Sequence, residues 1–196
     1  MNQTVNQKTT ILLIDLECTC NNEPPLPRDE MEIIEIGAVI VSLDAHTYTR
    51  CDERQIYVQP QRHTLLTPFC TRLTGIQQQH VDQASPLVAA LDELSSWLTQ
   101  YRLSAWGSWG KFDQRHFETE TKLKGLANPL GPLRHLNIKQ LFANIHGHRL
   151  GLARAVQHAG LDFQGRLHCG LDDTRNIGRL LEHDVQLRKA IINSQQ

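Results

Sequence analysis

Three stretches in the first third of the chain have the apolar pattern of β-strands. Residues 10–14 form a short, nearly continuous apolar run that ends abruptly at an acidic residue, as in a central strand covered on both faces. Residues 33–43 are rich in Ile and Val, and residues 55–58 lead to a proline, so both are predicted to be strands. The short connections favour antiparallel pairing.

The pattern changes to helical spacing after residue 85. The apolar residues between 87 and 98 recur on one face of a helix predicted at 86–101, with Ser85 as its N-cap and Pro86 as its first residue. The remaining elements are predicted to be a loop at 20–31, a strand at 103–106, a helix at 113–123, a strand or short helix at 136–142, and helices at 150–159 and 172–191.

This order of elements predicts a single α/β or α+β domain with a mixed sheet, because the later strands are joined by helical crossovers and should pair in parallel. The chain has 196 residues, which is enough for one sizeable core. We expect a short N-terminal tail at residues 1–9 and one folded domain at residues 10–190.

Composition narrows the class of protein. The chain is 40% hydrophobic and 21% charged, as in a soluble globular protein. Neither an apolar run of roughly 20 residues nor a secretion signal is recognisable, so no membrane is expected. Five cysteines are an odd number, which favours free thiols in the cytoplasm. The net charge is only −1, so any nucleic acid would need a local groove and metal ions.

Asp15 and Glu17 are the first candidates for chemistry. They follow the first apolar strand and are two residues apart, so their side chains project from the same face. Two neighbouring carboxylates repel each other and lose hydration, and a hard divalent cation such as Mg²⁺ or Mn²⁺ relieves both costs. The alternative is a strand end that simply faces solvent.

Three later residues extend this set. Asp113 stands at the start of a predicted helix, and His168 precedes Asp173 by five residues near the start of the last helix. A histidine with a pKa near neutrality can take a proton from a water molecule. Taken singly, each acid could be only a helix cap and the histidine only a surface residue. The order of all five along the chain is the specific feature.

That order resembles the DEDDh (DnaQ-like) 3′→5′ exonuclease superfamily over about residues 10–183. The chain is most similar to the Eri-type short-RNA exoribonucleases, in segments 15–20, 69–76, 106–109, 137–139 and 165–177. One departure is that Gly110 stands where many members carry the middle acid. We assign Asp113 to that role, because it is the only acid nearby before Glu118.

The resemblance implies an RNase H-like α/β fold, in which helices flank a mixed sheet of about five strands. It also implies two divalent cations, Mg²⁺ or Mn²⁺, held by Asp15, Glu17, Asp113 and Asp173. His168 would deprotonate the attacking water. The expected activity is 3′→5′ hydrolysis of single-stranded nucleic acid, RNA rather than DNA, with release of 5′-mononucleotides.

Further residues are implied to contact the substrate by the same resemblance. The expected contacts with the terminal nucleotides are Leu16, Cys18, Thr19, Cys20, Leu73, Thr74, Ile76, Trp106 and Trp109. Core packing is an equally good reading of the two tryptophans. The candidate phosphate contacts are Lys111, Arg115, Arg149 and Arg166, although any one such residue is more often a solvated surface charge.

Two other functions stay open at this point. An enzyme of the same fold could act on very short oligoribonucleotides, and it would prefer dinucleotides to longer strands. A nuclease fold could also serve as a non-catalytic nucleic-acid-binding regulatory module, although all five catalytic positions are filled here. The sequence leaves the oligomeric state open.

Overall fold

The computed structural model describes residues 8–194. Most of the predicted tail at residues 1–9 therefore lies outside the described residues. The domain limits at residues 10 and 190 stay a prediction, although the first strand begins at Thr9 and the last helix ends at Asn193.

Six strands form one mixed sheet within the described residues. They are β1 (Thr9–Cys18), β2 (Ile33–Leu43), β3 (Tyr48–Gln59), β4 (Ser85–Pro86), β5 (Ala105–Ser108) and β6 (Arg134–Asn137). Their order in the sheet is β4-β3-β2-β1-β5-β6. The pairs β1–β2 and β2–β3 are antiparallel, whereas β1–β5 and β5–β6 are parallel. The four segments predicted as strands and the pairing directions are thus confirmed. Strand β6 lies at the start of the segment that was left open between strand and helix, and the two-residue β4 was not predicted.

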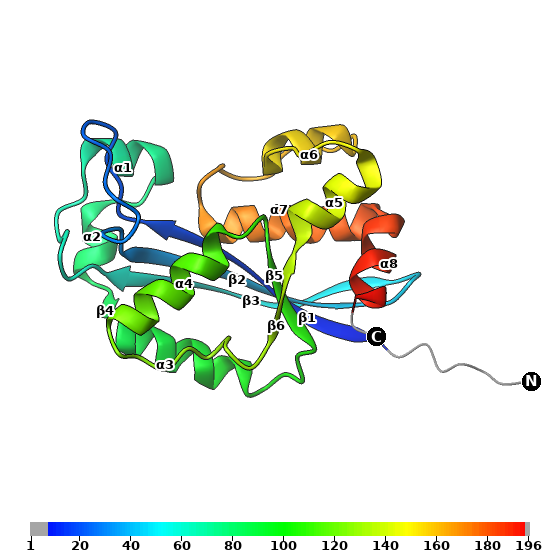
Figure 1. Ribbon diagram of the computed structural model, residues 1–196, viewed down its shortest axis with the longest axis horizontal. Helices are drawn as coiled ribbons and strands as arrows, with labels where there is room; N and C mark the ends of the chain where they lie inside the picture. The colour runs from blue at the N-terminus through cyan, green and yellow to red at the C-terminus, as the bar shows by residue number, and fades with distance from the viewer. Residues whose placement is uncertain (1–7, 195–196) are drawn as a thin grey trace, which may run out of the picture.

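The helices lie around this sheet, as Figure 1 shows. They are α1 (Pro68–Thr74), α2 (Gln78–Asp82), α3 (Leu87–Leu98), α4 (Phe112–Leu123), α5 (Ile138–His146), α6 (Leu152–His158), α7 (Gly170–His183) and α8 (Val185–Asn193). No helix among residues 8–194 is long and apolar enough to cross a membrane.

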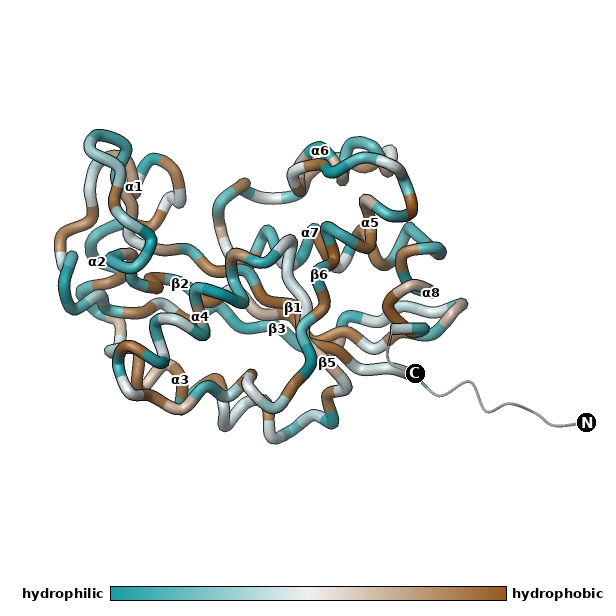
Figure 2. The backbone as a smooth tube through the Cα atoms, in the orientation of Figure 1, coloured by the Kyte–Doolittle hydropathy of each residue, from teal (hydrophilic) through white to brown (hydrophobic). Residues whose placement is uncertain are grey.

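Alternation along β1 divides the core into two layers. Leu12, Ile14 and Leu16 belong to one buried cluster, which includes the apolar faces of α3 and α4. Ile11 and Leu13 belong to the other, which includes α5, α6, α7 and α8. In Figure 2 the central strands are largely brown, while the outer helices carry teal segments. Because successive side chains on a strand point to opposite faces, residues 15 and 17 must lie on the α7 side of the sheet.

Two predicted helix boundaries were wrong. The helix predicted at 172–191 is two helices, because Asp184 ends α7 in an extended conformation and its side chain accepts hydrogen bonds from the first amides of α8. Ser85 does not cap α3. Ser85 and Pro86 pair with β3 as strand β4, and Pro86 is the residue that precedes the helix.

The segment at 136–142, which was predicted to be either a strand or a short helix, contains parts of both. Strand β6 ends at Asn137 and helix α5 begins at Ile138. The short helices α1 and α2 were not predicted. Thr67 caps α1 with its side chain, and Gly75 ends it with a φ of 80°. A seven-residue helix is too short to show a periodic apolar pattern.

Candidate active site

Two acidic side chains extend from the end of β1 toward α7. Asp15 and Glu17 continue the row of Ile11 and Leu13, whose side chains pack against the α7 layer. Asp173 lies in the first turn of α7. Glu17 and Asp173 are only 7% and 5% exposed. The alternation of one strand and the start of one helix therefore bring three carboxylates together.

A close approach of two backbones positions α7. A Cβ atom added to Gly37 of β2 would lie 2.0 Å from the carbonyl carbon of Gly170, the first residue of α7. No other residue fits at Gly37 without moving the helix. Glu35 of β2 also stabilises this contact between β2 and α7, because its Oε1 accepts a hydrogen bond from the amide of Leu171 at 3.1 Å.

Asp113 reaches the site from α4, on the other layer. It lies in the first turn of α4 and is 5% exposed. Its Oδ1 accepts a hydrogen bond from the amide of Leu16 at 3.1 Å. This bond ties the start of α4 to the end of β1, between the two acids of the strand.

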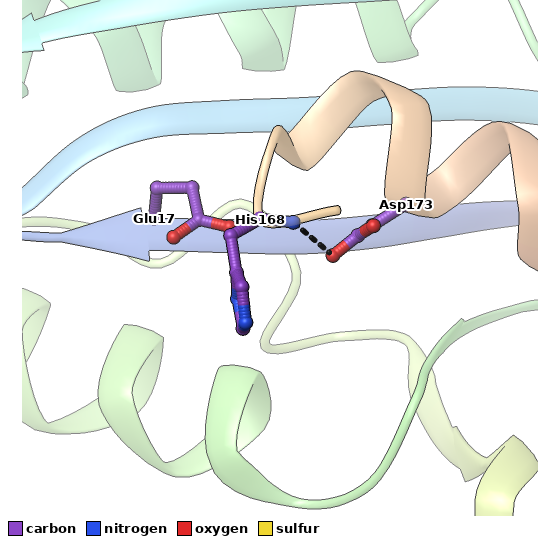
Figure 3. Close-up of side chains that lie close together, drawn as sticks. All are labelled: Glu17, His168 and Asp173. Carbon is purple, nitrogen blue, oxygen red and sulfur yellow. Dashed lines mark hydrogen bonds between the residues drawn. The ribbon is translucent and has the colours of Figure 1, made fainter. Parts of the chain in front are cut away.

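Glu17, His168 and Asp173 form the tightest part of the site. One potential metal-ligating atom from each lies within 4.8 Å of the others, and Figure 3 shows the three side chains together. His168 has a φ of 64°, a left-handed conformation that is uncommon outside glycine. Its amide donates to Oδ2 of Asp173 at 3.3 Å. This bond helps to hold the strained loop, which leaves the imidazole exposed above two buried acids.

The four acids and His168 all line one cleft with a volume of about 690 Å³. The structure thus brings together every residue that the sequence assigned to catalysis.

Burial makes these carboxylates reluctant to ionise. Loss of hydration, followed by repulsion from neighbouring acids, raises the pKa of Glu17 to about 9. Burial likewise raises the pKa of Asp173 to about 7. The pKa values of Asp15 and Asp113 are also raised, mainly by desolvation.

The same residues fit a divalent metal. Oδ1 of Asp173 is buried and has no hydrogen-bond partner, and an unpartnered buried oxygen is costly. Carboxylate oxygens are the ligands that hard divalent cations prefer, and a cation here would remove both the repulsion and the missing partner. Asp15, Glu17, Asp113 and Asp173 are the residues that would hold it.

His168 is suited to accept a proton. Partial burial of the ring, together with the nearby Arg166, lowers its pKa below the ordinary value of 6.5. The imidazole is therefore neutral at neutral pH, with a nitrogen available as a base. Arg166 itself donates a hydrogen bond to the carbonyl of Arg72 at the end of α1.

The predicted substrate contacts separate into two groups. Five of them line the cleft: Leu16, Cys18, Cys20, Leu73 and Trp109. Four others lie outside its lining: Thr19, Thr74, Ile76 and Trp106. Thr19, Thr74 and Ile76 are at most 3% exposed.

The two tryptophans have different environments. Trp106 is 3% exposed, belongs to the α3–α4 core cluster and packs on His135 with ring centroids 4.4 Å apart. Core packing is thus the better reading of Trp106. Trp109 is only partly buried and faces the cleft, while its Nε1 donates to the carbonyl of Leu150 at 3.2 Å.

Glu35 is the residue that sequence reasoning missed. It lies directly opposite Glu17 in the β1–β2 pair and is 1% exposed. One carboxylate oxygen accepts from Gln55 and Leu171, and the other, Oε2, has no partner. An acid inside an otherwise apolar strand was the available signal. Its meaning depended on the strand register, which the sequence did not show.

Comparison with known proteins agrees with this geometry. The family model described as Exonuclease (RNase_T) matches residues 12–181. Human 3'-5' exoribonuclease 1 is 34% identical over 187 residues, which are 90% of this chain and 52% of that protein. The chain therefore spans about half the length of this relative.

Two solved structures are similar over nearly the whole chain. The nuclease domain of 3'hExo, a DEDDh family member bound to rAMP, has a TM-score of 0.79 at 29% identity and covers 100% of this chain and 96% of that chain. A structure of histone mRNA stem-loop recognition by 3'-exonuclease also has a TM-score of 0.79 at 29% identity, over 95% of this chain and 83% of that chain. These likenesses confirm the RNase H-like fold.

Members of this family use divalent metal ions. The family match over residues 12–181 and the likeness to DEDDh nuclease domains together show that the chain belongs to the exonuclease family, as a DEDDh-type member similar to the Eri exoribonucleases.

Proposed function

We propose that the chain is a 3′→5′ exonuclease that hydrolyses single-stranded nucleic acid, RNA in preference to DNA, and releases 5′-mononucleotides. The observation that carries this proposal is the convergence of Asp15, Glu17, Asp113, Asp173 and His168 in one cleft. The preference for RNA is supported by the names of the relatives, an exoribonuclease and a nuclease that recognises an mRNA stem-loop.

Two Mg²⁺ or Mn²⁺ ions, when bound, would stabilise the charge that develops on the attacking and leaving oxygens of the phosphodiester. Asp15, Glu17, Asp113 and Asp173 are the residues that would bind them. His168 takes the proton from the attacking water, since its imidazole is neutral and lies above Glu17 and Asp173. Leu16, Cys18, Cys20, Leu73 and Trp109 line the space for the terminal nucleotide.

We also propose that residues 10–190 form the exonuclease domain and that the protein is cytoplasmic. The second proposal is supported by the five cysteines, all of which are free thiols, as expected in a reducing compartment.

The test is a time course on single-stranded RNA and DNA oligonucleotides that carry a 5′ label. Each is incubated with Mg²⁺, with Mn²⁺ or with chelator, and Asp15→Ala controls for contaminating nucleases. We expect a ladder that shortens stepwise from the 3′ end, requires metal and disappears in the variant. RNA should be degraded faster than DNA. Absence of a ladder in either metal, beside measurable binding, would instead support a regulatory module.

A further inference from the structure

A second groove opens beside the catalytic cleft. It has a volume of about 660 Å³ and shares two wall residues, Trp109 and Phe112, with the cleft. Its other walls come from the loop at 24–31, from the first half of α4, from the start of α5 and from the loop before α6. The groove thus continues directly from the place where the terminal nucleotide is expected.

Positive charge is concentrated in this groove. Five cations line it, against one acid, Asp29: Arg28, Lys111, Arg115, Lys139 and Arg149. Four of the five are exposed, and Lys139 is partly buried. In the described part of the chain, none of the five forms an ion pair or a side-chain hydrogen bond. A molecule with a net charge of −1 therefore keeps a local excess of unpaired cations at one place.

An aromatic ring stands where groove and cleft meet. Phe112 is 38% exposed. Its ring stacks on that of His116, with centroids 5.4 Å apart and planes 6° apart. The stacking holds an apolar ring at the border of the two spaces. Such a ring can receive a base, and stacking of a base on an aromatic side chain contributes about 1–3 kcal/mol for any sequence.

We propose that this basic groove binds the backbone phosphates of the nucleotides that precede the 3′-terminal one, with a base stacked on Phe112. This inference rests on the proposed exonuclease function and names its substrate class. Strands of several nucleotides are the substrates, whereas dinucleotides lack the phosphates that the groove would bind.

The arrangement of charge supports binding of a polyanion in the groove. The cleft is lined by four acids and one arginine, Arg154, and its acids repel phosphates unless cations neutralise them. The five cations of the groove supply neutralising charge for the phosphates that lie beyond the cleft. Each phosphate that meets a lysine or arginine releases counterions, so binding in the groove must weaken steeply as salt concentration rises.

The test is the triple variant Lys111→Ala, Arg115→Ala and Arg149→Ala. The value of kcat/KM is measured on a single strand of about 12 nucleotides and on a dinucleotide with the same 3′ end, between about 50 and 200 mM KCl. We expect about a tenfold or larger loss on the long strand, mainly through KM, and a salt-dependence slope that is smaller by about 2. The loss on the dinucleotide should be at least about tenfold smaller.

A matched control removes the same charge elsewhere. Arg102, Lys122 and Lys189 are exposed and lie outside the groove lining, so Arg102→Ala, Lys122→Ala and Lys189→Ala should leave the salt slope and the long-strand KM nearly unchanged. An equal loss in this control would overturn the proposal, since it would show an effect of net charge alone. An equal loss of the groove variant on both substrates would also overturn it.

A binding measurement distinguishes failure of this proposal from failure of the proposed exonuclease function. Fluorescence anisotropy with a labelled strand of about 12 nucleotides is measured in the Asp15→Asn background, with and without the groove substitutions. Loss of affinity only with the groove substitutions supports the proposal even if no hydrolysis is found in the wild type. Phe112→Leu should weaken binding about fivefold or more, and Phe112→Tyr should restore it. Equal weakening by both would contradict the stacking.

Discussion

Two sets of buried carboxylates lie at opposite ends of α4, and their partners are very different. At the far end, Glu32 is fully buried and accepts hydrogen bonds from the amides of Gln61, Arg62 and His63 and from the ammonium of Lys124. Burial alone would raise its pKa, but these donors lower the pKa of Glu32 to about 2. The carboxylate is ionised and fully occupied by the protein itself.

Glu120 completes the partnered set. It is 3% exposed, accepts from the amide of Ile33 at 2.8 Å, and pairs with Lys124 at 2.8 Å and His116 at 3.4 Å. Burial opposes ionisation here too, yet these partners lower the pKa of Glu120 below its ordinary value.

At the near end, Glu17, Asp113 and Asp173 are at most 7% exposed and Asp15 is partly buried, but these acids have fewer donors. Asp113 accepts a hydrogen bond from the amide of Leu16, and Asp173 accepts one from the amide of His168. Oδ1 of Asp173 and Oε2 of Glu35 have no hydrogen-bond partner, and the pKa values of Asp15, Glu17, Asp113 and Asp173 are raised instead. Burial is therefore not what distinguishes a functional carboxylate in this molecule. The small number of internal donors leaves carboxylate oxygens in the cleft that can accept a cation, whereas the oxygens of Glu32 and Glu120 are held by several donors or by Lys124. The substitutions below test this difference.

The largest effect is expected from Asp173→Asn. If Asp173 binds metal as we propose, its removal should lower kcat/KM about 10³-fold or more. The metal-free variant should be no less stable than the wild type at pH 7, because the neutral amide removes an acid whose pKa the fold raises to about 7. Ladder assays and chemical unfolding in chelator measure the two quantities. Clear destabilisation would mean that Asp173 is a structural acid after all.

Added Mg²⁺ should stabilise the wild type through the cleft acids alone. A ligand that binds only the folded state contributes about 2.7 kcal/mol at 100 times its Kd. Thermal unfolding with and without Mg²⁺ measures this gain. Glu32→Gln should keep the gain and Asp173→Asn should lose most of it. A gain that persists in Asp173→Asn would place the metal elsewhere.

Glu32→Gln should show the opposite behaviour. The side-chain amide of the Glu32→Gln variant cannot accept all the hydrogen bonds that the carboxylate of Glu32 accepts. The free energy of unfolding should therefore fall by about 1–3 kcal/mol. The folded fraction should hydrolyse RNA at the wild-type rate. Asp92→Asn on the exposed face of α3 is the matched control and should be neutral within about 0.5 kcal/mol. A variant as stable as this control would contradict the role of Glu32.

The smallest effect is expected in the free energy of unfolding at acidic pH. Glu32 has a pKa of about 2 in the folded state against an ordinary 4.5, so its contribution is complete above the unfolded pKa and is lost as the pH falls from 4.5 toward 2. The difference in unfolding free energy between wild type and Glu32→Gln should therefore shrink over that range. Urea titrations at several pH values measure it, and a constant difference would show that ionisation of Glu32 is irrelevant.

Much of the candidate catalytic set could be predicted from local sequence pattern. The apolar run before Asp15 indicated a central strand, and the spacing of Asp15 and Glu17 placed both on one face. The structure confirms that face, since both acids continue the row of Ile11 and Leu13. The break at Asp184 also had a local signal, a helix N-cap residue inside an otherwise continuous pattern, which our prediction overlooked.

Other features had no local signal. Trp106 and Trp109 are equally aromatic and three residues apart, yet one is buried in the core and the other faces the cleft. Glu32 and Glu35 both lie close to or within the same apolar strand, but one meets four donors and the other lies opposite Glu17. Their difference depends on segments far away in the chain.

The sequence by itself determined four of the strands, the facing of the first two acids and the order of the five candidate catalytic residues, because these follow from backbone periodicity and from short spacings. Only the tertiary structure decided which buried acids have donors, how closely α7 approaches β2 at Gly37 and Gly170, and that cations from four separate segments share one groove. Those properties arise from contacts between residues that are distant along the chain, and such contacts are set by the packing of the whole molecule.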